Sequence, residues 1–166
     1  MKTIKEITTA LKEATQIEPW MEAIKRDERA GVQKAWTSFE RRLAKAQAVL
    51  AAHEQKLAFD ASYLPHPDAY IAGVDEAGRG PLAGPVVTAA VILPNYCQEL
   101  LGINDSKQLS KEVRESYVER IKEHAISYSV HFQPAQVIDT VNIYEATRQS
   151  MVASIEGLNV QPDVVI

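Results

Sequence analysis

Two adjacent carboxylates, Asp75 and Glu76, end an apolar run that begins at Tyr70 and has the composition of a β-strand. Carboxylate oxygens are ligands that hard cations prefer. Neighbouring residues of a regular strand point to opposite faces, so both carboxylates serve one site only if the backbone bends at the pair. Gly78 and Gly80 follow and supply the freedom for such a bend. The segment predicts a cation site at a strand end; the alternative is two solvated residues that open a turn.

Arg79 lies between these two glycines, and the three residues together suit an anion or a ribose hydroxyl. The glycines leave their N–H groups open to a ligand, and the arginine adds positive charge. A dinucleotide-binding fingerprint is the obvious rival, since Gly84 gives a third glycine after a strand. That motif needs a helix directly after it. Prolines at positions 81 and 85 and a strand-like sequence follow instead, which excludes the dinucleotide reading.

The elements that would position this segment alternate between strands and helices. Residues 86–93 are nearly all apolar, which predicts a strand buried on both faces. Residues 127–132 alternate, with their apolar residues on one side. Ser110 predicts the start of one helix, and another is expected from about Asn142 to Gly157. Residues 162–166 look like a further strand.

The first 62 residues are predicted to be helical. Thr3 and Glu6 have the spacing of a capping box, and Pro19 suits the first turn of a second helix. From residue 32 to residue 57 apolar positions recur with spacings of 4 and 3, as in a heptad repeat. We expect the two short helices and the body of the protein to cover this stripe, with self-association as the alternative. The basic residues beside it form either a solvated face or a phosphate-binding face: Lys34, Arg41, Arg42 and Lys45.

Composition places the domain boundary and limits the class of protein. Tyr63-Leu-Pro-His-Pro-Asp interrupts helix, so we expect a helical extension at 1–62, a linker at 63–69 and a main domain at 70–166. Lys and Arg number 11 against 9 Asp and Glu in residues 1–62, but 7 against 13 in the remainder. Cys97 is the single cysteine, and we expect a reduced, cytoplasmic protein without a membrane segment. His53, His66, His124 and His131 show no spacing typical of a metal cage, and Cys97 has no partner that would make a catalytic triad.

Three motifs together resemble the type 2 ribonucleases H, the ribonuclease HII family of bacteria. Gly73-Val-Asp-Glu-Ala-Gly-Arg-Gly, with the Pro-Leu-Ala-Gly-Pro-Val-Val that follows, is similar to the signature of that family. Asn104-Asp-Ser-Lys-Gln-Leu-Ser and Asn142-Ile-Tyr-Glu-Ala-Thr follow in the family's order. The resemblance covers about residues 70–166, and some bacterial members carry a helical extension like that of residues 1–62.

The resemblance implies an α/β fold, a ribonuclease H-like mixed sheet flanked by helices that ends after its fourth strand, preceded by a small all-helical domain. It implies a metal-dependent endonuclease of replication and repair that hydrolyses the RNA strand of RNA/DNA hybrids, incises at single ribonucleotides in duplex DNA and leaves 5′-phosphate ends. Asp75 and Glu76 would be catalytic and would bind Mn²⁺ or Mg²⁺. Substrate would meet Gly78, Arg79, Gly80, Ser106 and Lys107.

The chain also departs from the family pattern. The family's third carboxylate is expected at the position after Ile166, and the fourth lies further on. Asp163 opens its strand, so we expect it not to be a ligand. We therefore expect the 166 residues alone to be weakly active or inactive, as a monomer or as a dimer through the helical extension. The alternative function is a non-catalytic fragment that binds nucleic acid or protein through that extension.

Overall fold

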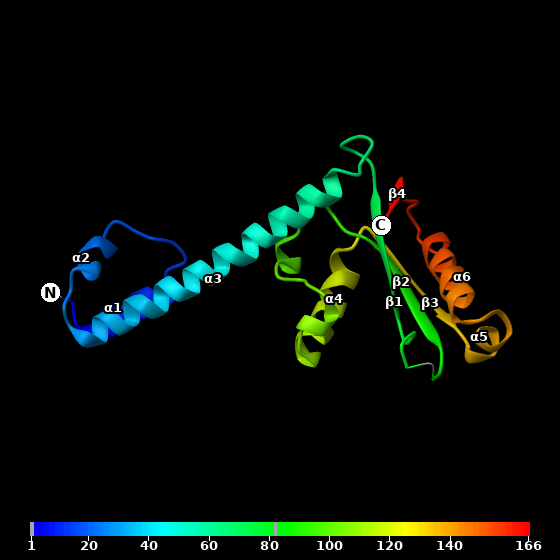
Figure 1. The fold of residues 1–166 in the computed structure, drawn as a ribbon. Coiled ribbons are helices and arrows are strands. Elements are labelled where there is room, and N and C mark those ends of the chain that lie inside the picture. The colour runs from blue at the N-terminus through cyan, green and yellow to red at the C-terminus, as the bar shows by residue number, and fades with distance from the viewer. Residues whose placement is uncertain (1, 82) are drawn as a thin grey trace. The chain divides into compact units, whose positions relative to one another are not determined.

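The computed structural model describes residues 2–81 and 83–166 (Figure 1). Internal contacts divide the chain into two compact units, Met1–His53 and Glu54–Ile166, which are described in turn. The family-derived expectation of a helical first part and a strand-containing second part agrees with the order of the elements. Within the described ranges, no helix is both long and apolar enough to cross a bilayer.

The first unit contains α1 (Ile4–Glu13), α2 (Met21–Lys25) and the beginning of α3 (Ala30–Ala61). The predicted capping box is confirmed, because the Thr3 side chain accepts a hydrogen bond from the Glu6 amide and the Glu6 carboxylate accepts one from the Thr3 amide. The three helices share one apolar core, made of Ile7, Leu11, Ala14, Met21, Ile24, Val32, Trp36 and Phe39.

The heptad stripe on α3 is covered over its first half. Val32, Trp36 and Phe39 are buried, whereas Leu43 is half-buried and Leu50 keeps 40% of its surface exposed. At about 1.5 Å per residue, α1 spans about 15 Å and α3 about 48 Å, so the two short helices cannot cover the whole stripe. The prediction of a fully covered stripe is therefore wrong at Ala46 and Leu50, which are exposed, whereas His53 and Leu57 are half-buried.

The second unit is built on a mixed sheet of β1 (Ile71–Ala77), β2 (Val86–Ile92), β3 (Ser127–Gln133) and β4 (Val164–Val165). The strand order is β3-β2-β1-β4 (Figure 1). β1 and β3 pair with β2 in antiparallel fashion, and β4 pairs with β1 in parallel. The predicted mixed sheet is confirmed. The antiparallel ladder with β2 determines where β1 ends, and the acidic pair lies near that end.

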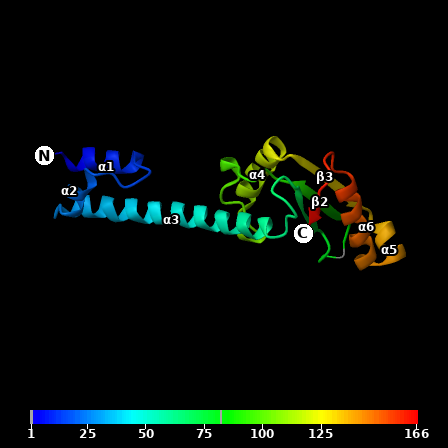
Figure 2. The same ribbon diagram turned by 90° about the horizontal axis from the view of Figure 1, so that it is seen from above.

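Helices flank this sheet, as predicted. The second unit adds α4 (Lys111–His124), α5 (Ala135–Val141) and α6 (Ile143–Glu156), with two short 3₁₀ turns, η1 (Gln98–Leu100) and η2 (Ser106–Gln108). α6 packs along β1, β2 and β3 on one face of the sheet (Figures 1 and 2). On β2 this face is buried, but Ala89 on the other face is exposed and Val91 half-buried. The prediction that β2 is buried on both faces is wrong, because α6 covers one face alone.

β3 alternates as predicted, but its polar side faces α6. Tyr128, Val130 and Phe132 are 45%, 50% and 65% exposed. On the opposite face His131 Nδ1 lies 2.9 Å from Ser150 Oγ on α6, and Thr88 Oγ1 donates to the Ser150 carbonyl at 2.8 Å. A polar group can be buried at low cost when it is hydrogen-bonded, so this network allows the polar side of β3 to pack against the helix.

Candidate active site at the end of β1

Asp75 and Glu76 both lie inside the paired part of β1. Asp75 is opposite Ala89, and Glu76 is opposite the buried Thr88. Side chains of directly opposed residues share a face, so the ladder places Asp75 on the exposed face of the sheet and Glu76 on the face that α6 covers. The expected backbone bend at the pair is not found, because pairing continues through Ala77. The chain turns one residue later.

The turn begins at Gly78, whose φ is +86°. A Cβ atom at this position would lie 2.6 Å from the carbonyl oxygen of Pro85, where the chain returns towards β2. Glycine is required there by the fold. Gly80 differs, since a Cβ atom built on it has no neighbour within 4 Å among the described atoms. Nothing packed in the turn explains the missing side chain at Gly80, which leaves room for a ligand from outside.

Arg79 links the turn to the acidic pair. Its Nη1 atom lies 3.3 Å from Glu76 Oε1, and the two side chains are 47% and 20% exposed. The Asp75 carboxylate accepts a hydrogen bond from the Glu76 amide at 2.8 Å. A guanidinium carries five N–H donors, so one contact to Glu76 leaves capacity for an anion. Two carboxylates are a donor set that fits a hard divalent cation, although Glu76 here holds Arg79 instead.

The start of β4 lies beside the start of β1. The Asp163 carboxylate accepts a hydrogen bond from the Tyr70 amide at 2.8 Å, and Ile71 is level with Val164. Further along, the Val74 amide donates to the Ile166 carbonyl at 2.9 Å. Asp163 thus has a structural partner at the end of β1 opposite to Asp75.

Ser106 and Lys107 form η2 with Gln108, in a different part of the unit. The Asp105 side chain caps this turn by accepting from the Lys107 amide at 2.9 Å. Arg114 on α4 donates to the Ser106 carbonyl at 3.1 Å. Lys56 near the end of α3 donates to the Ile103 carbonyl at 2.7 Å. Arg114 attaches the turn to α4, and Lys56 attaches the segment just before the turn to α3. A contact of Ser106 or Lys107 with the Asp75–Gly80 segment stays a prediction.

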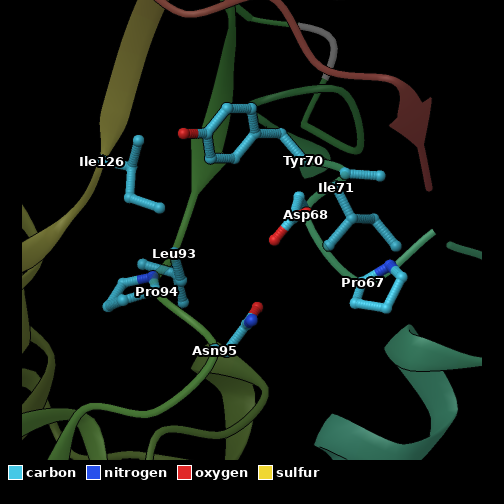
Figure 3. A pocket seen from close by; sticks show the side chains of 9 residues that line it. Pro67, Asp68, Tyr70, Ile71, Leu93, Pro94, Asn95 and Ile126 are labelled. Carbon is cyan, nitrogen blue, oxygen red and sulfur yellow. The ribbon is translucent and has the colours of Figure 1, made fainter.

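A cavity of about 300 Å³ lies at the opposite end of β1. Figure 3 shows Asp68, Tyr70 and Asn95 around it, with the apolar side chains of Leu93 and Ile126. Its lining residue on β1 is Ile71. Ile71 precedes Asp75 by four residues, which separates the two by about 13 Å along the strand. This cavity is therefore separate from the acidic pair.

Sequence reasoning missed one grouping of side chains altogether. Cys97 lies before η1 and His124 at the end of α4, and nothing in the sequence connects the two. The structure brings their Sγ and imidazole nitrogen together with the Glu99 carboxylate, all three ligand atoms within 4.8 Å of one another. Twenty-six residues separate Cys97 from His124, so no local spacing could have indicated the group.

Comparison with a solved structure identifies the type of fold. The crystal structure of ribonuclease H2 from Pyrococcus horikoshii OT3 matches with a TM-score of 0.52 and 31% identity, over 58% of this chain and 48% of that chain. The mixed sheet and its flanking helices therefore have the ribonuclease H type of fold. The helical first part has a match of its own, to the model of the Ribonuclease HII N-terminal domain over residues 3–64.

The Ribonuclease HII family model matches residues 72–166, and the chain belongs to this family. Curated relatives named Ribonuclease HII include that of Halalkalibacterium halodurans, 49% identical over 99% of this chain, and that of Bacillus licheniformis, 41% identical over 99%. The protein of Enterococcus faecalis is 42% identical over 100% of the chain. The chain spans 63% to 64% of the length of these relatives.

Proposed function

We propose that this chain carries the first half of the active site of a metal-dependent endonuclease. The enzyme hydrolyses the RNA strand of RNA/DNA hybrids, incises beside single ribonucleotides in duplex DNA and leaves 5′-phosphate ends. The observation that carries this proposal is the acidic pair at the end of β1, followed directly by the Gly78 turn, in a chain of the ribonuclease HII family. Such an enzyme serves DNA replication and repair in the bacterial cytoplasm.

Asp75 and Glu76 are the proposed catalytic and metal-binding residues, for Mn²⁺ or Mg²⁺. A bound pair of such ions activates a water and stabilises the leaving oxygen of a phosphodiester. The proposal requires the Glu76 carboxylate to exchange its contact with Arg79 for one with the cation. It also requires the two carboxylates to reach one site although the ladder directs them to opposite faces. Arg79 is then released towards substrate phosphate.

Gly78, Arg79 and Gly80 are proposed to read the ribose. The 2′-hydroxyl is the group that distinguishes RNA from DNA, and reading it requires close approach of protein donors and acceptors. The open space around Gly80 supports this role. Lys107 is proposed to bind backbone phosphate with help from Ser106, and both residues are exposed.

The 166 residues alone are proposed to be weakly active or inactive. The register of β4 supports this reasoning, since Ile71 is level with Val164 and Ala72 with Val165. In that register the position after Ile166 is level with Val74, one residue from Asp75 and one strand spacing away, about 4.8 Å. A carboxylate there would lie on the same face of the sheet as Val74 and Glu76. Asp163 lies four residues before this position, about 13 Å away along the strand, so it cannot replace a carboxylate there.

The decisive experiment measures metal binding and cleavage by the same chain. Mn²⁺ binding is followed by titration calorimetry, and nicking by a labelled duplex with one embedded ribonucleotide. We expect Asp75→Asn and Glu76→Gln each to weaken Mn²⁺ binding at least about tenfold. The matched control is Asp163→Asn, which keeps an acceptor for the Tyr70 amide and should leave Mn²⁺ binding unchanged.

Two outcomes would count against the proposal. Mn²⁺ binding that survives Asp75→Asn removes this residue from the metal site. Duplex binding that is lost when residues 1–62 are deleted favours the non-catalytic alternative, in which the helical extension binds nucleic acid. Absence of nicking alone does not, since the 166 residues are proposed to be weakly active or inactive. The partly exposed heptad stripe on α3 supports this alternative and also supports dimerisation.

A further inference from the structure

A second cluster of ligand atoms lies away from the acidic pair, between η1 and the end of α4. Cys97 is the residue before η1, Glu99 lies within η1, and His124 is the last residue of α4. The thiol of Cys97 donates a hydrogen bond to Glu99 Oε2 at 3.2 Å. The sulfur, carboxylate and imidazole ligand atoms lie within 4.8 Å of one another.

We propose that Cys97, Glu99 and His124 form a zinc site that is distinct from the Mg²⁺ or Mn²⁺ site at Asp75 and Glu76. Sulfur, imidazole and carboxylate together suit Zn²⁺, whereas Mg²⁺ and Mn²⁺ select oxygen ligands. A thiolate and a carboxylate also neutralise the charge of one divalent ion, with the histidine neutral. Water takes the fourth position.

The distances require only small movements. Zinc binds sulfur at about 2.3 Å and nitrogen or oxygen at about 2.1 Å, so donor atoms of a tetrahedral site lie about 3.3 to 3.7 Å apart. The sulfur and the carboxylate are already 3.2 Å apart, and the widest separation in the group does not exceed 4.8 Å. A shift of about 1 Å therefore completes the arrangement, which rotation of the Glu99 and His124 side chains can supply.

Other contacts hold the two segments in place without the metal. The Tyr117 hydroxyl donates to the Leu101 carbonyl at 2.7 Å, and Arg120 donates to the Glu99 carbonyl at 3.3 Å. Cys97, Leu100 and Tyr117 share one buried apolar cluster. A site whose ligands come from two fixed segments loses less conformational entropy on binding, so its affinity is higher.

A zinc ion at this site has to displace the proton of the Cys97 thiol. Burial and the hydrogen bond to Glu99 raise the pKa of the Cys97 thiol, which opposes the loss of this proton. The pKa of Glu99 is lowered by a hydrogen bond from its own backbone amide and by one from the Cys97 thiol, so its carboxylate is ionised. A bound zinc replaces the thiol proton, and the proton leaves to solvent.

The test uses the 166-residue chain, reduced and free of chelator. Zinc is titrated calorimetrically, and Co²⁺ serves as a spectroscopic substitute whose sulfur charge-transfer band reports a Co–thiolate bond. We expect one strong zinc site and a Co–thiolate band. Cys97→Ser should abolish the band, and His124→Ala should weaken zinc binding at least about tenfold.

Two controls separate this site from others in the chain. His66→Ala removes an exposed linker histidine and should leave zinc binding unchanged. Asp75→Asn should leave the Co–thiolate band intact even where Mn²⁺ binding is lost, so this proposal and the proposed nuclease site fail separately. Circular dichroism confirms that each variant is folded. The proposal is overturned if the parent chain does not bind zinc. It is also overturned if the folded variants Cys97→Ser and His124→Ala bind zinc as tightly as the parent chain does.

Discussion

Gly78 and Pro85 approach so closely that a Cβ atom on Gly78 would lie 2.6 Å from the Pro85 carbonyl oxygen. Gly78 also has a φ of +86°. Residues other than glycine adopt this backbone conformation at a cost of about 1–3 kcal/mol. We predict that Gly78→Ala lowers the free energy of unfolding of the second unit by at least about 2 kcal/mol. Urea unfolding followed by circular dichroism measures this loss.

Gly80→Ala is the matched control for the turn, because a Cβ atom there meets nothing within 4 Å. We expect its stability to stay within about 0.5 kcal/mol of the parent chain, as for surface substitutions. Affinity for an RNA/DNA hybrid should nevertheless fall, since the added methyl occupies space proposed for the ribose. Unchanged hybrid affinity in a stable Gly80→Ala protein would contradict that role.

Arg42 has a structural function in the first unit. Its Nη2 atom donates to the Leu11 carbonyl at 2.7 Å and to the Ala14 carbonyl at 2.6 Å, which satisfies the C-terminal end of α1. We predict that Arg42→Ala destabilises this unit by about 1–2 kcal/mol, while the neighbouring Arg41→Ala has little effect. Thermal unfolding of both variants measures the difference. Equal melting temperatures would show that these hydrogen bonds contribute nothing net.

Glu145 gives stability a defined pH dependence. Hydrogen bonds from Arg148, and then from Gln149, lower the pKa of Glu145 from 4.5 to about 2. A depressed folded-state pKa stabilises the protein above the unfolded-state value, and this contribution is lost as the pH falls from 4.5 towards 2. We predict that Glu145→Gln lowers the unfolding temperature at pH 6 and that the difference from the parent chain narrows at pH 3. The exposed Glu156→Gln on the same helix should show no such pattern.

Asn142 begins α6 with a φ of +72°. Its side chain accepts hydrogen bonds from the amides of Tyr144 and Glu145 at 3.0 and 3.1 Å. Asn142→Ala removes the side-chain cap and leaves a residue with a Cβ atom at positive φ. We therefore expect the free energy of unfolding to fall by about 1–3 kcal/mol. Asn142→Gly removes the cap but tolerates positive φ, and should be milder. Urea unfolding ranks the two variants, and the reverse order would exclude backbone strain as the cause.

Helix starts and the alternation of strands could be predicted because they depend on local chemistry. Thr3, Ser110 and Asn142 each cap the helix that their position indicates. α5 was missed because its seven residues begin after Pro134 without a side-chain cap. Which face of β3 is buried could not be predicted either. The apolar side of an alternating strand is normally the buried one, but here the polar side packs against α6, where His131 contacts Ser150.

The sequence by itself determined the acidic pair, the glycines that follow it and the family to which these motifs point, because those signals lie within a few residues of one another. The tertiary structure decided what each side chain meets. Pairing with β2 directs Asp75 and Glu76 to opposite faces, and the packing of α4 on η1 brings His124 to Cys97. Such contacts join residues that are distant along the chain, and no local propensity encodes them.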